Sequence, residues 1–173
     1  MEAMSVEVPD IDQLLSMTSP AQYGDDAPQG NGRGGALHLS SVLPAVSSAI
    51  GHPVATAVHA NPHRLQEMIG LPDARSAVVA LVDGLGYWNI NMRLGHAPYL
   101  RSLMADSANQ RPLSTCMPST TVAAMSTFGT GTCPGLTGMT GYTQLNPENG
   151  EICQLISFKN AMAPLKLQRQ PTI

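Results

Sequence analysis

The apolar residues of this chain gather into short blocks that begin at position 37 and are divided by Gly, Pro and small polar residues. The block at 42–50 follows Ser40 and Ser41, either of which suits a helix cap, and the block at 62–69 begins with a proline. A Gly and then a Pro follow each block, and both residue types end helices. The pattern therefore predicts two short helices, over 42–50 and over 62–69.

The most continuous apolar run is Ser-Ala-Val-Val-Ala-Leu-Val at 76–82. A β-branched run of this kind is typical of a strand that is buried on both faces of a parallel sheet. Beyond it, the chain favours helices and strands in alternation, which indicates an α/β layered fold with a mostly parallel central sheet flanked by helices. The remaining predicted elements are helices over 87–94, 98–106 and 122–128, strands over 111–115 and 152–157, and a Gly-rich loop over 129–141.

Composition separates two parts of the chain. Positions 1–36 are rich in Gly, Pro, Ser and Asp and have little to bury, so we expect a disordered or weakly ordered tail there. Positions 37–173 are long enough for a domain with a hydrophobic core. The chain ends without a cap or turn after its last apolar residues, and we expect that it is cut from a longer protein.

Charge and hydropathy argue against several partners. The net charge is −3 and Lys and Arg form no cluster, so we expect no nucleic-acid partner. The apolar runs are too short to span a bilayer, and positions 1–20 contain acidic residues but no Lys or Arg, unlike a secretory signal. We therefore expect no membrane partner and a cytoplasmic location, where Cys116, Cys133 and Cys153 are reduced packing residues.

Asp83 is the first candidate for chemistry, because it ends the predicted strand at 76–82. Carboxylates at the C-terminal ends of parallel strands lie where α/β sheets build their sites, and Asp oxygens suit divalent cations. The glycines at 84 and 86 leave room for a sharp turn and a bound ion. On position alone, Asp83 could equally be the cap of a helix that starts near Leu85 and not a metal ligand.

Thr121 is the second candidate and ends the segment Pro-Ser-Thr-Thr at 118–121. Hydroxyls at the start of a helix lie near free backbone N–H groups, and this surrounding favours an anionic phosphoryl group. A threonine also needs a base or a metal ion to act as a nucleophile. From these residues alone, helix capping by Thr121 stays open as well.

In their order and spacing, these segments resemble the type I phosphodiesterase/nucleotide pyrophosphatase branch of the alkaline phosphatase superfamily. In that family the nucleophile lies nine residues before a Thr-Gly pair, and Thr121 stands nine residues before Thr130. The resemblance covers 76–141 and, more loosely, the rest of the chain. The matching segments are the run that ends in Asp-Gly at 78–84, Ala-Pro-Tyr-Leu at 97–100, Pro-Ser-Thr-Thr at 118–121 and Thr-Gly-x-x-Pro-Gly-x-x-Gly at 130–138.

The resemblance implies an alkaline-phosphatase-like fold, of which 37–173 would be the N-terminal portion. It also implies hydrolysis of a small phosphate ester or a nucleotide-like substrate. Thr121 would attack phosphorus and form a phosphoenzyme intermediate. Two divalent metal ions, usually zinc, would take part, and Asp83 and Thr121 would be ligands of one of them.

Three positions depart from the family's pattern. Ala124 and Tyr142 stand where the nucleotide pyrophosphatases often have Asn, and Thr137 stands where a His is usual. These departures leave open whether the substrate is a nucleotide. A sulfatase motif that begins at Cys116 fails, because Thr120 occupies the place of its Arg.

The ligands of a metal pair are also incomplete. After Thr121 the chain has no Asp and no His, whereas a zinc ion takes about four donors, so we expect this chain to be inactive by itself. The histidines all lie upstream and match no ligand motif. Two alternatives remain: a phosphonate hydrolase, phosphomutase or phosphomonoesterase of the same superfamily, and a non-catalytic α/β interaction module in which Asp83 and Thr121 only cap helices.

Overall fold

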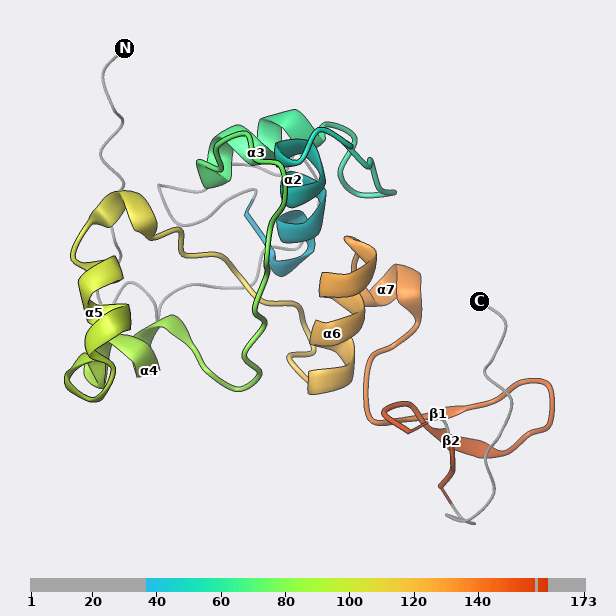
Figure 1. Cartoon of the computed structure of the whole chain (residues 1–173). Coiled ribbons are helices and arrows are strands. Elements are labelled where there is room, and N and C mark those ends of the chain that lie inside the picture. The colour runs from blue at the N-terminus through green and yellow to red at the C-terminus, as the bar shows by residue number, and fades with distance from the viewer. Residues whose placement is uncertain (1–36, 158, 162–173) are drawn as a thin grey trace.

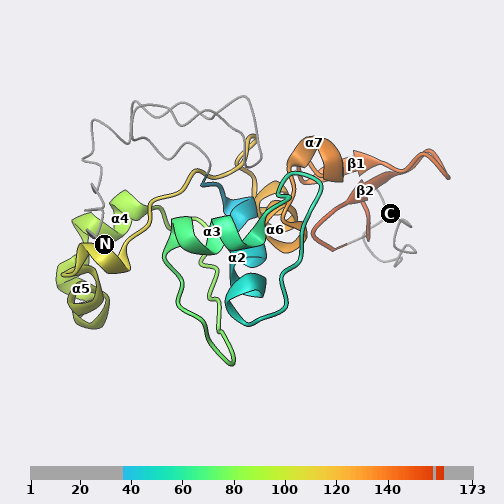
Figure 2. The ribbon, with the colours of Figure 1, turned by 90° about the horizontal axis from the view of Figure 1, so that it is seen from above.

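The structure, a computed structural model, describes residues 37–157 and 159–161, so the tail predicted for 1–36 lies outside the described residues. Its elements are spread along an elongated molecule, with α4 and α5 at one end, α2, α3 and α6 in the middle and a small sheet at the other end (Figures 1 and 2). The helices are η1 (Leu39–Ser41), α2 (Val42–Ala49), α3 (Pro62–Ile69), α4 (Tyr87–Met92), η2 (Leu94–His96), α5 (Pro98–Met104), η3 (Ser107–Asn109), α6 (Thr121–Thr130) and α7 (Pro134–Thr137). The strands are β1 (Thr143–Leu145), β2 (Ile152–Gln154) and β3 (Lys159–Asn160).

The two helices predicted at the start of the domain are confirmed. The α3 helix begins where Asn61 accepts a hydrogen bond from the backbone N–H of Arg64 at 3.1 Å, and it ends at Gly70, whose φ is 78°. A Pro at the first position and a left-handed Gly after the last are the usual limits of a helix. Before α2, Ser41 donates its hydroxyl to the carbonyl of His38 and makes no side-chain cap.

Polar side chains join α2 to α3. Ser48, which is 3% exposed, donates to Gln66 Oε1 at 2.6 Å and lies 2.8 Å from Nδ1 of His63. The amide of Gln66 donates in turn to Asp73 Oδ1 at 2.9 Å. A buried hydroxyl needs partners of this kind, because burial without a hydrogen bond is costly. The network therefore sets how the two helices lie against each other.

The core lies around α2, which packs against α3 and also contacts α6 in the middle of the molecule (Figure 1). Ala45 of α2, Leu65 of α3 and Ala123 of α6 are each 0% exposed. Small side chains at these helix faces let the helices approach closely, and Leu65 is the largest of the fully buried side chains. The described residues thus contain a compact helical centre built from α2, α3 and α6.

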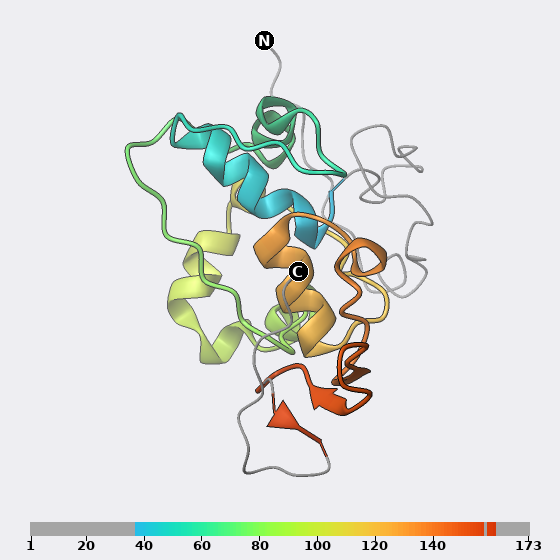
Figure 3. The same cartoon turned by 90° about the vertical axis from the view of Figure 1, so that its right-hand side faces the viewer.

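The predicted buried strand at 76–82 is not formed. These residues make an extended link without secondary structure between α3 and α4 (Figure 3), and Val78 is 97% exposed. A strand is held by hydrogen bonds to a neighbouring strand. No strand lies beside 76–82 in the part of the chain that the structure describes. The prediction of a strand here is wrong for this structure, although the apolar pattern that led to it is plain.

The predicted strand at 111–115 is also reduced. Only Ser114 pairs, in a single parallel bridge with His38. Its carbonyl accepts the N–H of Leu39 at 2.9 Å, and its own N–H donates to the carbonyl of Leu37 at 3.1 Å. This bridge ties the chain before α6 to the segment before η1.

The last third of the described chain differs from the prediction in both its helices and its strands. The segment at 129–141 was expected to be a loop, but α6 continues to Thr130 and Pro134 starts the short helix α7. The strand predicted over 152–157 is confirmed for Ile152–Gln154 only. It lies in a three-stranded antiparallel sheet of order β1-β2-β3. The described residues therefore form a mixture of helices with a small antiparallel sheet.

Candidate functional site

The two candidate residues from the sequence, Asp83 and Thr121, are in direct contact. The hydroxyl of Thr121 donates to Oδ2 of Asp83 at 2.9 Å, although the residues are 38 positions apart. Asp83 is exposed and Thr121 is half-buried, so the pair is open to a ligand from solvent. The structure thus brings together a hydroxyl and a carboxylate, while their roles stay predictions.

Thr121 is the first residue of α6, but it is not the cap of that helix. Thr120 has this function, since its side chain accepts the backbone N–H of Ala123 at 3.3 Å. The hydroxyl of Thr121 is therefore not used to cap the helix and donates to Asp83 instead. It lies at the positive end of a ten-residue helix, a surrounding that favours negative charge on its oxygen or on a group bound to it.

Asp83 lies at the turn that follows the extended link, ahead of α4. Gly84 has a φ of 69°, a left-handed conformation that suits Gly and turns the chain here. The residue that precedes α4 is Gly86, whose N–H donates a hydrogen bond to Oδ1 of Asn89 at 3.2 Å. Asp83 therefore stands three residues before the helix cap, and its carboxylate is directed to Thr121.

A third side chain, Tyr142, reaches the same hydroxyl. Its phenol oxygen lies 3.2 Å from Oγ1 of Thr121, and the residue is 52% exposed. The sequence had marked position 142 only as a departure from the family's Asn. The spacing of 21 residues from Thr121 was the signal that placed it near the site. The contact of the phenol with Thr121 Oγ1 could not be found from spacing, because it depends on how the chain folds back after α7.

Asp83 and Thr121 offer part of a metal site. Their two oxygens lie 2.9 Å apart, and oxygen donors suit divalent cations. Within residues 37–157 and 159–161, no group of three or more His, Cys, Asp or Glu side chains comes together to hold an ion. Because a zinc ion takes about four ligands, the pair fits one side of a metal site and does not complete it.

A Ser–His pair elsewhere in the chain is structural. Ser40 Oγ lies 2.9 Å from Nε2 of His59, as in a nucleophile with its base. Both residues are 0% exposed, so a substrate cannot reach them. The loop of His59 is also tied to the end of α6, where Thr56 donates to the carbonyl of Gly131 at 2.7 Å. This pair therefore joins segments of the fold.

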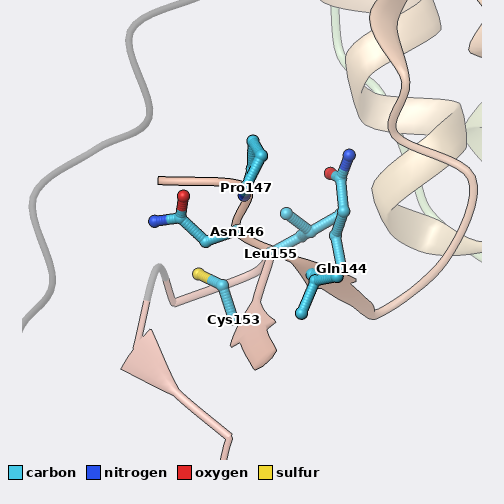
Figure 4. A pocket seen from close by; sticks show the side chains of 6 residues that line it. Gln144, Asn146, Pro147, Cys153 and Leu155 are labelled. Atoms are coloured by element: carbon cyan, nitrogen blue, oxygen red, sulfur yellow. The ribbon is translucent and has the colours of Figure 1, made fainter. Parts of the chain in front are cut away.

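A shallow hollow lies on the small sheet. Figure 4 shows side chains of both strands of the β1–β2 hairpin around it, including the thiol of Cys153. Neither Asp83 nor Thr121 lines it, so it is separate from the candidate site. The lining residues are Gln144, Leu145, Asn146, Pro147, Cys153 and Leu155.

No helix among the described residues has the length and apolar character needed to cross a bilayer.

Comparison with known proteins gave no matching curated protein and no matching solved structure. A family model does match, the one described as type I phosphodiesterase / nucleotide pyrophosphatase, over residues 77–172. That stretch is more than half of the 173 residues and contains Asp83, Thr121 and Tyr142. The chain therefore belongs to the type I phosphodiesterase/nucleotide pyrophosphatase family.

Proposed function

We propose that the protein is a metal-dependent hydrolase of phosphoric esters in which Thr121 is the nucleophile. The observation that carries the proposal is the 2.9 Å contact between Thr121 Oγ1 and Asp83 Oδ2. It joins the two residues that the family's motifs single out, across 38 positions of sequence. Family membership supports phosphoric ester hydrolysis in general, and the alkaline-phosphatase-like layered fold is part of the same proposal.

In the first step, the oxygen of Thr121 forms a bond to phosphorus while the bond from phosphorus to the leaving alcohol breaks. The Thr121 proton passes to water, and the leaving oxygen keeps the electron pair and then takes a proton from water. In the second step, a water oxygen bonds to phosphorus, the bond to Thr121 breaks and the threonine regains its proton. The start of α6 favours both the attacking oxygen and the phosphoryl group, because both carry negative charge.

Asp83 and Thr121 would hold one of two divalent metal ions, for which zinc is our proposal. When bound, such an ion supplies Lewis-acid stabilisation of the charge on the attacking and phosphoryl oxygens. The described part of the chain supplies two of the donors that such a site needs. We therefore expect little turnover from the 173-residue chain alone.

The substrate class we propose is a small phosphate diester or a nucleotide-like ester, which the protein would hydrolyse in the cytoplasm. The second candidate is a phosphonate hydrolase, phosphomutase or phosphomonoesterase on the same scaffold. It is favoured by Ala124, which stands where the nucleotide pyrophosphatases often have Asn. Parallel assays with bis-p-nitrophenyl phosphate, p-nitrophenyl phosphate and a phosphonate monoester separate these candidates by their relative kcat/KM.

The test of the nucleophile is Thr121→Ala in the natural full-length protein. We expect a loss of at least about 1,000-fold in kcat, since removal of a covalent nucleophile has effects of this size or larger. Thr130→Ala is the matched control, because Thr130 is an exposed threonine at the other end of α6. Unchanged turnover in Thr121→Ala, with the control also active, would overturn the assignment.

Metal dependence has its own measurement. We expect treatment with a chelator to remove turnover and added zinc to restore it, because the charge on the phosphoryl oxygens would otherwise lack a counter-charge. Direct metal analysis of the purified full-length protein gives the stoichiometry. Full activity in a protein shown to be free of metal would contradict this part of the proposal.

A further inference from the structure

Tyr142 has a hydroxyl at the oxygen that is proposed to attack phosphorus. Its Oη lies 3.2 Å from Thr121 Oγ1, and the same Thr121 oxygen lies 2.9 Å from Asp83 Oδ2. A threonine hydroxyl has one proton, and Thr121 uses it in the hydrogen bond that it donates to the Asp83 carboxylate. The proton in the contact with Tyr142 must then come from the phenol. Tyr142 is thus a hydrogen-bond donor aimed at the nucleophile.

We propose that Tyr142 binds the phosphoryl group while it is transferred to and from Thr121. This inference rests on the proposed function. Once Thr121 Oγ1 is bonded to phosphorus, the phosphoryl oxygens lie around the atom at which the phenol already points. The phenol then donates to one of these oxygens, whose negative charge grows in the transition state. Donors that are in place before the reaction are among the most effective sources of transition-state stabilisation.

The backbone of Tyr142 is held by the small sheet. Its carbonyl accepts the N–H of Leu155 at 2.8 Å, and Leu155 is 5% exposed. The next residue, Thr143, is paired with Gln154 in the β1–β2 ladder. Figure 1 shows this hairpin on the side where α6 begins. The hairpin therefore fixes the base of the side chain.

The phenol itself is left accessible by this arrangement. Tyr142 is 52% exposed, and Asp83, the other partner of the Thr121 hydroxyl, is exposed as well. A side chain that served only to fill the fold would be covered, as Leu65 is at 0% exposure. Tyr142 instead combines a fixed backbone with a hydroxyl that a substrate can reach.

The test is Tyr142→Phe in the full-length, metal-loaded protein, which removes the hydroxyl and keeps the ring. We expect kcat/KM for a phosphate diester to fall by about 10- to 100-fold, the range for loss of one donor to a charged oxygen. The inhibition constant of orthovanadate, a mimic of the transferred phosphoryl group, should rise by a similar factor. The melting temperature should stay the same, because the phenol is half exposed.

Two further variants make the result specific. Tyr142→Gln keeps a side-chain N–H donor and should retain more activity than Tyr142→Phe. Tyr99→Phe removes a phenol hydroxyl from a residue of α5 that is 72% exposed, and it should match the wild type. Wild-type values of kcat/KM and of the vanadate constant in Tyr142→Phe would overturn the inference.

The same experiment separates this inference from the proposed function. If Thr121→Ala is inactive and Tyr142→Phe equals the wild type, the role of Tyr142 is wrong and the proposed function stands. If Thr121→Ala keeps its turnover, or the metal-loaded wild type has none, both the nucleophile and the Tyr142 proposal fall together.

Discussion

The helical centre and the extended link at 76–82 are both rich in apolar residues, but only the centre is buried. Leu65 of α3 is 0% exposed, whereas Val78 of the link is 97% exposed. The difference lies in where backbone hydrogen bonds come from. A helix makes its own, so α2, α3 and α6 can form first and then bury one face each. A strand needs a neighbour before its apolar side chains can be covered, and the described residues place none beside the link.

The largest expected effect that tests this comparison is Leu65→Ala. We expect it to lower the free energy of unfolding of the chain by about 2–5 kcal/mol, because it leaves a cavity at a fully buried site. Val78→Ala is the matched change in the link and should stay within about 0.5 kcal/mol of the wild type. Urea unfolding followed by circular dichroism measures both. Equal effects at the two sites would show that the link is buried in solution.

The next effect concerns the end of α6. Gly131 has a φ of 61°, and a Cβ added there would lie 2.9 Å from Cγ2 of Thr56 and 3.0 Å from Cγ of Pro44. We expect Gly131→Ala to cost about 2–4 kcal/mol, from the left-handed backbone and from crowding. Gly51, with a φ of 81° and open space around its Cβ position, is the control. Gly51→Ala should cost about 1–2 kcal/mol, the backbone part alone. Thermal unfolding of the two variants gives the difference, and equal losses would mean that the contact with α2 and Thr56 is absent.

The smallest effect on stability is expected in the link itself. Val78→Lys combined with Val82→Lys places charges at residues that are 97% and 59% exposed. We expect the chain to bind less of a dye for exposed apolar surface, with a melting temperature close to that of the wild type, since solvated charges here cost little. Fluorescence titration with the dye measures the first result. A large drop in melting temperature would show that the link is packed against something.

Local signals in the sequence were enough for most helices. Asn61 and Gly70 mark the ends of α3, and these caps act over a few residues whatever the rest of the chain does. The loop predicted over 129–141 is only partly confirmed, because Pro134 occupies the first position of a short helix within it, which is a local signal of the same kind. The strand at 76–82 was wrong for a different reason, because strand pairing is not local.

The residues of the candidate site also fall into those that the sequence revealed and one that only the fold revealed. Asp83 and Thr121 were found from motif order and spacing, and the structure places their oxygens 2.9 Å apart. Tyr142 was noticed in the sequence only as a missing amide. Its contact with Thr121 arises because the chain turns back after α7 and the hairpin holds the tyrosine in place. A contact that depends on such a return has no signature in neighbouring residues.

By itself, the sequence determined the helices with clear caps, the family of the chain and the two residues at the start of its proposed chemistry. Each of these depends on residue types at short or regular spacing. Only the tertiary structure decided that the apolar run at 76–82 stays uncovered here and that the phenol of Tyr142 contacts the Thr121 hydroxyl. Both outcomes depend on which distant segments meet, since burial and hydrogen bonding between segments arise only when the chain has folded.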